Sequence, residues 1–185
     1  NSGGIAARLI DAAKVLVGRM PASLAQTNIV ANGMFGAVSG AAVAAASAVG
    51  TVMTPRMRED GYSRAYSAAV NVASAPAGML IPPSNTFIVY SLVSSTSIAA
   101  LFMAGVGPGL LWVIACLVVA LLMARRENYK RDTTHPTLSL ALLTIWRAVP
   151  SLLMIVIVIG GILAGWFTPT ESAAIAVIYC LVLGF

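Results

Sequence analysis

The sequence predicts an all-α polytopic membrane protein, and three observations support this fold class. Charged residues make up only 9% of its 185 residues, against about 25% in an ordinary soluble domain. Residues 20–55, 65–124 and 148–170 contain no Asp, Glu, Lys, Arg or His, and a membrane-spanning helix needs about 20 apolar residues. None of these stretches alternates strictly between polar and apolar residues, as the strands of a membrane barrel would.

The basic residues indicate which side of the membrane each loop faces. The net charge of +5 is concentrated beside the uncharged stretches, and the positive-inside rule assigns these basic groups to the cytoplasm. The groups are Arg8, Lys14 and Arg19; Arg56, Arg58 and Arg64; and Arg125, Arg126, Lys130 and Arg131. We expect residues 1–19 to form an amphipathic helix at the membrane interface. Because the chain opens on Asn1 and stops within an apolar run, we expect it to be an internal piece of a longer protein.

Residues 20–55 predict a re-entrant helical hairpin. Both flanks are assigned to the cytoplasm, and the stretch is shorter than the roughly 40 residues that two full crossings need. Its middle, residues 36–47, holds hardly any side chain larger than valine, so backbones can approach closely there. We expect the tip near Ser39-Gly40 and a binding site beside it, because non-helical backbone at membrane depth lines cavities. The alternative is a small-residue packing face, with Gly36 and Gly40 at GxxxG spacing.

Residues 62–97 predict a transmembrane helix that is interrupted in its middle. We expect a first half from about Ser63 to Leu80, because a helix cannot continue through Pro82 and Pro83. Discontinuous helices of this kind are typical of transporter binding sites. The alternative is a proline kink that neighbouring helices repair.

The two sides of this break offer different chemistry. The prolines have no N–H groups, so the carbonyls of Gly78 and Met79 lose their helical partners and become available to a cation. Beyond the break, Ser84, Asn85 or Thr86 can cap a second half-helix. The N-terminus of that half-helix presents N–H groups and a positive dipole end, which suit an anion.

The remaining stretches predict scaffold elements. Residues 98–124 predict a short helix and a crossing, residues 125–137 a cytoplasmic basic loop, and residues 138–147 an interfacial arm helix. Residues 148–185 predict further transmembrane helices. Within them, Thr168-Pro169-Thr170-Glu171 has the form of a capping box, with an intramembrane ion ligand at Glu171 as the alternative.

Five short motifs occur in one order along the chain and carry a family resemblance. They are Ser39-Gly40-Ala41-Ala42; Thr54-Pro55-Arg56-Met57 with Gly61-Tyr62; Ile81-Pro82-Pro83-Ser84; Leu101-Phe102-Met103-Ala104-Gly105; and Phe167-Thr168-Pro169-Thr170-Glu171. Over essentially the whole chain, this order resembles the large membrane subunit (DctM-type permease) of the tripartite ATP-independent periplasmic (TRAP) transporters. One motif departs from the family: its hairpin tip usually reads Ser-Gly-Ser, and Ala41 stands in place of the second serine. One hydroxyl is therefore missing at the tip, while the backbone carbonyls remain.

The resemblance implies an elevator-type secondary transporter of the bacterial inner membrane, with several membrane passes. It implies sodium as the coupling ion, a periplasmic substrate-binding protein that delivers the substrate, and a small membrane subunit alongside. It also implies an inverted-repeat fold of which this chain is a fragment, so that residues 148–185 begin the second repeat.

The hairpin tip and the helix break together form the expected site. A hard cation such as sodium favours oxygen ligands, and the expected ligands are Ser39, Gly40, Gly78, Met79 and Pro83. The stretch 65–124 offers no arginine to an anion, so helix N-termini, hydroxyls and amides must attract it. The residues expected to bind the substrate are Ser39, Ser84, Asn85 and Thr86.

The leading hypothesis for function is sodium-coupled uptake of a small organic acid anion, such as a C4-dicarboxylate or a sugar acid. We do not expect an enzyme, because no histidine, aspartate or cysteine pair lies in the apolar stretches to activate a nucleophile. We expect no cofactor apart from the coupling ion and no nucleic-acid partner, since the basic groups are short and separated by spans that lie in lipid. The alternative is a passive channel or a non-transporting scaffold subunit.

Overall fold

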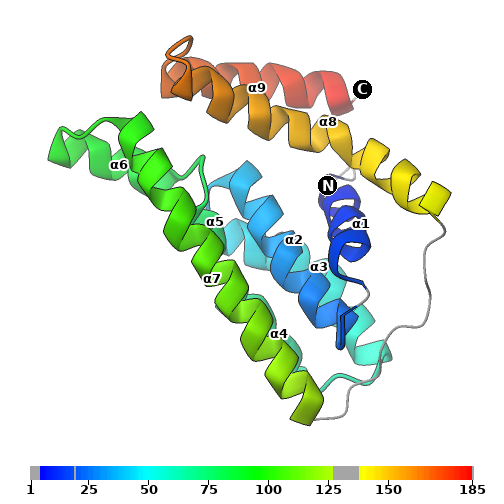
Figure 1. Ribbon diagram of the computed structural model, residues 1–185. Coiled ribbons are helices and arrows are strands. Elements are labelled where there is room, and N and C mark those ends of the chain that lie inside the picture. The colour runs from blue at the N-terminus through cyan, green and yellow to red at the C-terminus, as the bar shows by residue number, and fades with distance from the viewer. Residues whose placement is uncertain (1–4, 19, 127–137, 185) are drawn as a thin grey trace.

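A computed structural model describes residues 5–18, 20–126 and 138–184, and all of its regular structure in these ranges is helical (Figure 1). The all-α part of the predicted fold class is therefore confirmed for the described residues. The helices are α1 (Ile5–Val17), α2 (Ser23–Ser39), α3 (Ala42–Glu59), α4 (Arg64–Ser74), α5 (Ala77–Leu80), α6 (Asn85–Ser94), α7 (Ile98–Arg126), α8 (Leu138–Leu163) and α9 (Pro169–Gly184).

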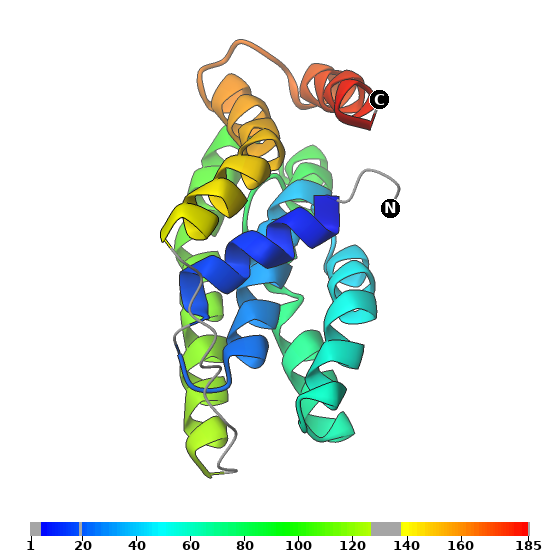
Figure 2. The same ribbon diagram turned by 90° about the vertical axis from the view of Figure 1, so that its right-hand side faces the viewer.

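The helix α2 lies at the centre of the molecule. Helices α2, α3, α4 and α7 run roughly side by side, and α1 crosses α2 (Figure 2). Between α2, α4 and α7 the buried apolar side chains include Ile29, Tyr66 and Ala120, and between α1, α2 and α3 they include Ile10 and Met53. Helix α2 thus packs against protein on several sides, whereas Val43, Ala44 and Ser47 of α3 are exposed.

The discontinuous element contains two breaks. The first helix, α4, begins beside Ser63 as predicted, and the Ser63 hydroxyl caps it by accepting a hydrogen bond from the Tyr66 N–H at 3.2 Å. The helix ends at Ser74, however, before the expected end at Leu80, because Pro76 has no N–H to continue it. The single turn α5 follows, and residues 81–84 form the second break.

The helix α7 is continuous, although the sequence favours a short helix followed by a separate crossing. Pro108 lies inside it, and the glycines on either side pack on the same neighbouring segment. Gly105 lies against Phe87 and Leu80, and Gly109 lies against Ile81. Of the described residues, those of α7 form the one helix that is long and apolar enough to cross a membrane.

Helices α8 and α9 form a pair beyond the hairpin tip, where Val158 and Ile162 of α8 pack on Phe102 (Figure 1). The expected interfacial arm and the following crossing are one helix here, α8, with Pro150 inside it. At the start of α9, Glu171 accepts hydrogen bonds from the Thr168 N–H at 2.7 Å and from the Thr168 hydroxyl at 2.8 Å. The Glu171 N–H donates to the Thr168 hydroxyl at 3.3 Å, so the capping box is confirmed.

The expected loop at residues 125–137 lies largely outside the described residues, and so do residues 1–4 and Arg19 of the predicted interfacial helix. Within residues 1–19 the described helix is α1, whose Leu9, Ile10 and Ala13 are buried while Asp11 is exposed.

Candidate functional site

The hairpin turns at Gly40 and Ala41, between α2 and α3. Gly40 has φ 64° and ψ 15°, which is the left-handed region that strains any residue with a Cβ atom. Its N–H donates to the Gly36 carbonyl at 2.7 Å and so closes the end of α2. Ala41 is extended, and α3 starts directly after it. The turn thus lies at the residues that the small-residue pattern indicates.

The hairpin tip lies against the second break of the discontinuous element. The Asn85 N–H, at the start of α6, donates to the Gly40 carbonyl across 3.3 Å. A Cβ atom added to Gly40 would lie only 2.8 Å from the Pro83 carbonyl oxygen and 3.2 Å from the Asn85 nitrogen. Glycine is therefore required at this position for two reasons, namely its backbone conformation and the close approach of residues 83–85.

A second backbone contact joins α2 to α5 about one helical turn before the tip. A Cβ atom on Gly36 would lie 2.1 Å from the Gly78 Cα atom, and one on Gly78 would lie 2.5 Å from the Gly36 Cα atom. Both residues are buried. The hairpin and the discontinuous element are thus in contact through their backbones, and the Gly78 carbonyl is held beside the hairpin.

The two carbonyls before the prolines differ in their partners. Pro82 has no N–H to give to the Gly78 carbonyl, as the sequence predicts. The Met79 carbonyl accepts a hydrogen bond from the Ser84 hydroxyl at 2.5 Å, so the expectation that it is free is wrong. Ser84 occupies the N-cap position of α6 but makes no side-chain cap bond, because its buried hydroxyl is directed to Met79 instead.

A cavity of about 210 Å³ lies where the hairpin tip, the break and the helix pair α8–α9 meet. Four residues expected in the site line it together: Ser39, Gly40, Pro83 and Asn85. The other lining residues are apolar, namely Ala37, Val38, Ile88, Met154, Val158, Ile162 and Ala176.

The remaining expected site residues lie outside this cavity. Thr86 lines a neighbouring hollow on α6, together with Asn85, Val89 and Tyr90. Gly78 contacts the hairpin at Gly36. Ser84 and Met79 bond to each other beside the cavity lining.

The polar groups that the described residues place at the cavity are neutral. They comprise the Ser39 hydroxyl, which is 3.3 Å from the Ala41 carbonyl oxygen, the amide of Asn85, and the backbone of Gly40 and Pro83. Neutral oxygen ligands suit a hard monovalent cation better than a transition metal, which prefers imidazole or thiolate. Within the described ranges no group of three His, Cys, Asp or Glu residues could hold a metal ion.

Comparison with known proteins identifies the family. Residues 1–185 match the family described as the tripartite ATP-independent periplasmic transporter, DctM component. The chain belongs to this family. The family consists of transporter components rather than enzymes, in agreement with the expectation that the chain is not an enzyme.

This DctM-family chain is similar in sequence to several curated proteins. It is 55% identical over 99% of its length to the uncharacterized protein YgiK of Salmonella typhimurium. It is 41% identical over 100% of its length to SiaM, the sialic acid TRAP transporter large permease protein of Vibrio cholerae. It is 40% identical over 96% of its length to DctM, the C4-dicarboxylate TRAP transporter large permease protein of Pseudomonas aeruginosa. The chain spans 42–43% of the length of these three relatives.

One polar network of this DctM-family chain was missed by the sequence interpretation. The side-chain nitrogen of Asn32 in α2 lies 3.0 Å from Asn71 Oδ1 and 2.8 Å from Ser74 Oγ, both in α4. The side chain of Asn71 in turn donates to the Ala46 carbonyl of α3 at 2.9 Å. The signal was available, because Asn28, Asn32 and Asn71 are amides in otherwise apolar stretches, and buried amides need partners.

Proposed function

We propose that this chain forms part of the transport site of a sodium-coupled secondary transporter that takes up a small organic acid anion. The observation that supports this proposal most directly is the contact between the hairpin tip and the helix break around one uncharged cavity. Irregular backbone of two separate segments meets there, and in membrane transporters such backbone lines binding sites.

The cation is held by oxygen atoms on the hairpin side of this contact. The Ser39 hydroxyl and the carbonyls of Gly40 and Pro83 are at the cavity, and the Gly78 carbonyl lies beside the hairpin without an N–H from Pro82. These ligands carry no formal charge, which suits sodium better than a divalent cation.

The anion is held on the α6 side. The first turn of α6 provides N–H groups and the positive end of the helix dipole, and the Asn85 side chain adds an amide donor. Bound sodium adds a positive charge to a cavity whose described lining residues carry none. The two ligands therefore stabilise each other, with a coupling free energy of about 1–3 kcal/mol, which is typical of linked sites.

The substrate is a small organic acid, such as a C4-dicarboxylate or a sugar acid. The large permease relatives named for sialic acid and for C4-dicarboxylates support this class. The intact transporter is a multi-pass protein of the bacterial inner membrane with an elevator mechanism. It receives substrate from a periplasmic binding protein and works with a small membrane subunit, in keeping with the family description.

Reconstitution of the intact transporter tests this proposal. The full-length large subunit and the small subunit are placed in liposomes, and uptake of labelled dicarboxylates and sugar acids is measured with the purified binding protein outside. We expect saturable uptake that requires both an inward sodium gradient and the binding protein. Flux that is non-saturating and independent of sodium would instead indicate a passive channel and would refute the proposal.

A further inference from the structure

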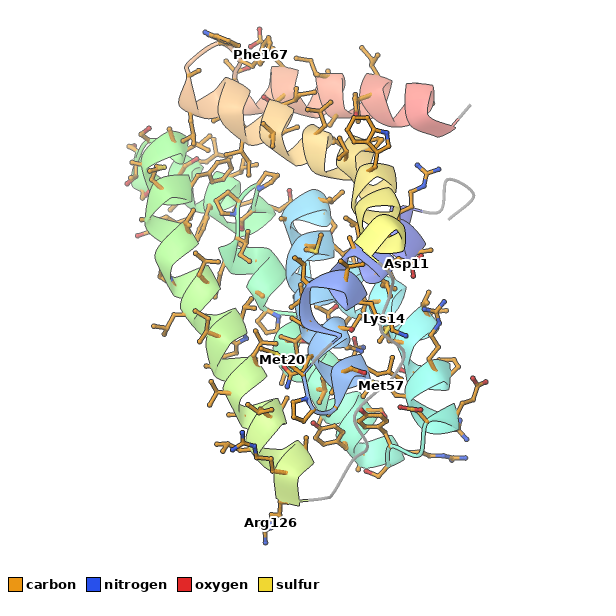
Figure 3. The ribbon with its side chains drawn as sticks, turned by 45° about the vertical axis from the view of Figure 1, so that its right-hand side comes forward. Asp11, Lys14, Met20, Met57, Arg126 and Phe167 are labelled. Atoms are coloured by element: carbon orange, nitrogen blue, oxygen red, sulfur yellow. The ribbon has the colours of Figure 1, made fainter. Side chains whose placement is uncertain are left out.

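A second polar cavity, separate from the hairpin tip, lies between α1 and the first part of α8. Its volume is about 520 Å³, and it is lined by Ala7, Arg8, Asp11, Thr144, Trp146 and Pro150. The two helices are distant in the sequence but pack side by side, with Asp11 on the side of α1 near the start of α8 (Figure 3). Both segments were predicted from the sequence to lie at the membrane interface.

This cavity contains opposite charges that have no partner in the described part of the chain. Arg8 and Asp11 are three residues apart on α1, so their side chains lie on one face of the helix. Neither makes a hydrogen bond or an ion pair with a described residue. The cavity therefore offers a guanidinium donor and a carboxylate acceptor to a ligand that carries both charges.

The third component is an aromatic ring at the rim. The Trp146 side chain is 74% exposed. Exposed tryptophan next to charged groups is typical of the boundary between lipid headgroups and acyl chains, where the indole is partly in each environment. The neighbouring α1 has a buried apolar face with Leu9 and Ile10, so its Arg8 and Asp11 are directed away from the protein core.

We propose that this cavity binds the headgroup of a phospholipid with a primary ammonium group, such as phosphatidylethanolamine. The Arg8 guanidinium binds the phosphate with paired hydrogen bonds, and the Asp11 carboxylate accepts hydrogen bonds from the ammonium. Trp146 packs at the level where the acyl chains begin. A choline headgroup has no N–H to donate to Asp11, and a glycerol headgroup has no positive charge. Each of these two headgroups therefore pairs with only part of the polar groups in the cavity.

The test uses the intact transporter in detergent, with phosphatidylethanolamine, phosphatidylcholine and phosphatidylglycerol of the same chain length. Affinity is measured by native mass spectrometry and by the lipid-induced rise in melting temperature. We expect the parent protein to prefer the ethanolamine lipid. Asp11→Asn should reduce that preference about two- to fivefold, and Arg8→Gln should weaken all three lipids by a similar factor, as partly exposed charge pairs contribute up to about 1 kcal/mol.

The control is Asp60→Asn, which removes an exposed carboxylate after α3, outside the cavity lining. Arg8→Lys keeps the charge but loses the paired geometry and should bind with intermediate affinity. The proposal is overturned if Asp11→Asn retains the full ethanolamine preference while its melting temperature without lipid equals that of the parent. It is also overturned if inorganic phosphate stabilises the parent as much as the lipid does, because the site would then bind a free anion. None of these measurements depends on transport.

Discussion

Gly40 shows how much of the site depends on a single missing side chain. Both its φ of 64° and the nearby Pro83 carbonyl oxygen exclude a side chain at this position. Gly61 also has a positive φ, 90°, but it has open space around it. We expect Gly61→Ala to cost only the backbone strain, about 1–2 kcal/mol of stability. Gly40→Ala should cost more, and it should abolish uptake because the tip can no longer approach the break. Melting temperature and uptake are measured for both variants, and equal losses in the two would contradict the role of the contact.

Ser39 and Asn85 should have separable effects on the two ligands. We expect Ser39→Ala to raise the sodium concentration needed for half-maximal uptake, because it removes one oxygen ligand. Asn85→Ala should raise the KM for substrate more than it changes the dependence on sodium. A fivefold change in either is about 1 kcal/mol, within the range typical of coupled sites. The control is Ser47→Ala on the exposed side of α3. Variants that transport like the parent, with the same sodium dependence, would remove both residues from the site.

At the scale of elements, the contact between Gly36 and Gly78 fixes α5 against α2. An added methyl group would lie 2.1 Å from backbone, and backbone cannot move as a flexible side chain does. We expect Gly36→Ala and Gly78→Ala each to lower stability by about 1–3 kcal/mol or more. The matched control is Gly160→Ala in α8, which has nothing within 4 Å and should stabilise its helix by about 0.5–1 kcal/mol. The melting temperatures of the three variants test this prediction. A Gly36→Ala protein as stable as the parent would argue against a rigid junction between α2 and α5.

The elements also show which features a sequence can predict. Local signals were sufficient where a short stretch of sequence determines the geometry, as with the helix start near Ser63 and the capping box of Thr168 and Glu171. Local signals failed where tertiary contacts determine whether a helix ends or continues. Pro76 ends a helix that the apolar pattern continues, whereas Pro108 does not, because α7 is packed against the same segment on both sides of it.

At the scale of the whole molecule, the hairpin should enter and leave from one side of the membrane. Met20, before α2, is partly exposed, and Arg58, at the end of α3, is exposed. With Cys116 and Cys180 replaced by serine, Met20→Cys and Arg58→Cys should both react with an impermeant thiol reagent from the cytoplasmic side only. Labelling from opposite sides would eliminate the re-entrant hairpin and the site with it. Arg126→Cys, at the end of α7 and in the basic group expected to face the cytoplasm, provides the reference in the same vesicles.

The candidate site was only partly predictable, because part of it depends on how distant helices pack. The sequence indicates Ser39-Gly40 and the double proline as two irregular points, since small residues and missing N–H groups are visible locally. The hydrogen bond between Gly40 and Asn85 depends on how α2 and α6 are placed, and so does the closing of the cavity by α8 and α9. The bond from the Ser84 hydroxyl to the Met79 carbonyl spans only five residues, so it depends on the backbone of the break itself.

The composition of the cavity also has a consequence for protons. None of the described side chains that line it titrates, since Ser39 and Asn85 are the polar ones among them. Acidic and basic conditions therefore leave its charge unchanged, unlike that of a site built on carboxylates or histidines. We expect the KM for a fully ionised anion to be constant between about pH 5.5 and 8.5 at fixed sodium concentration. Any loss of uptake in acid should then follow the protonation of the substrate itself. A step near pH 6–7 with a permanently charged sulfonate substrate would show that an ionisable group other than these lining residues enters the site.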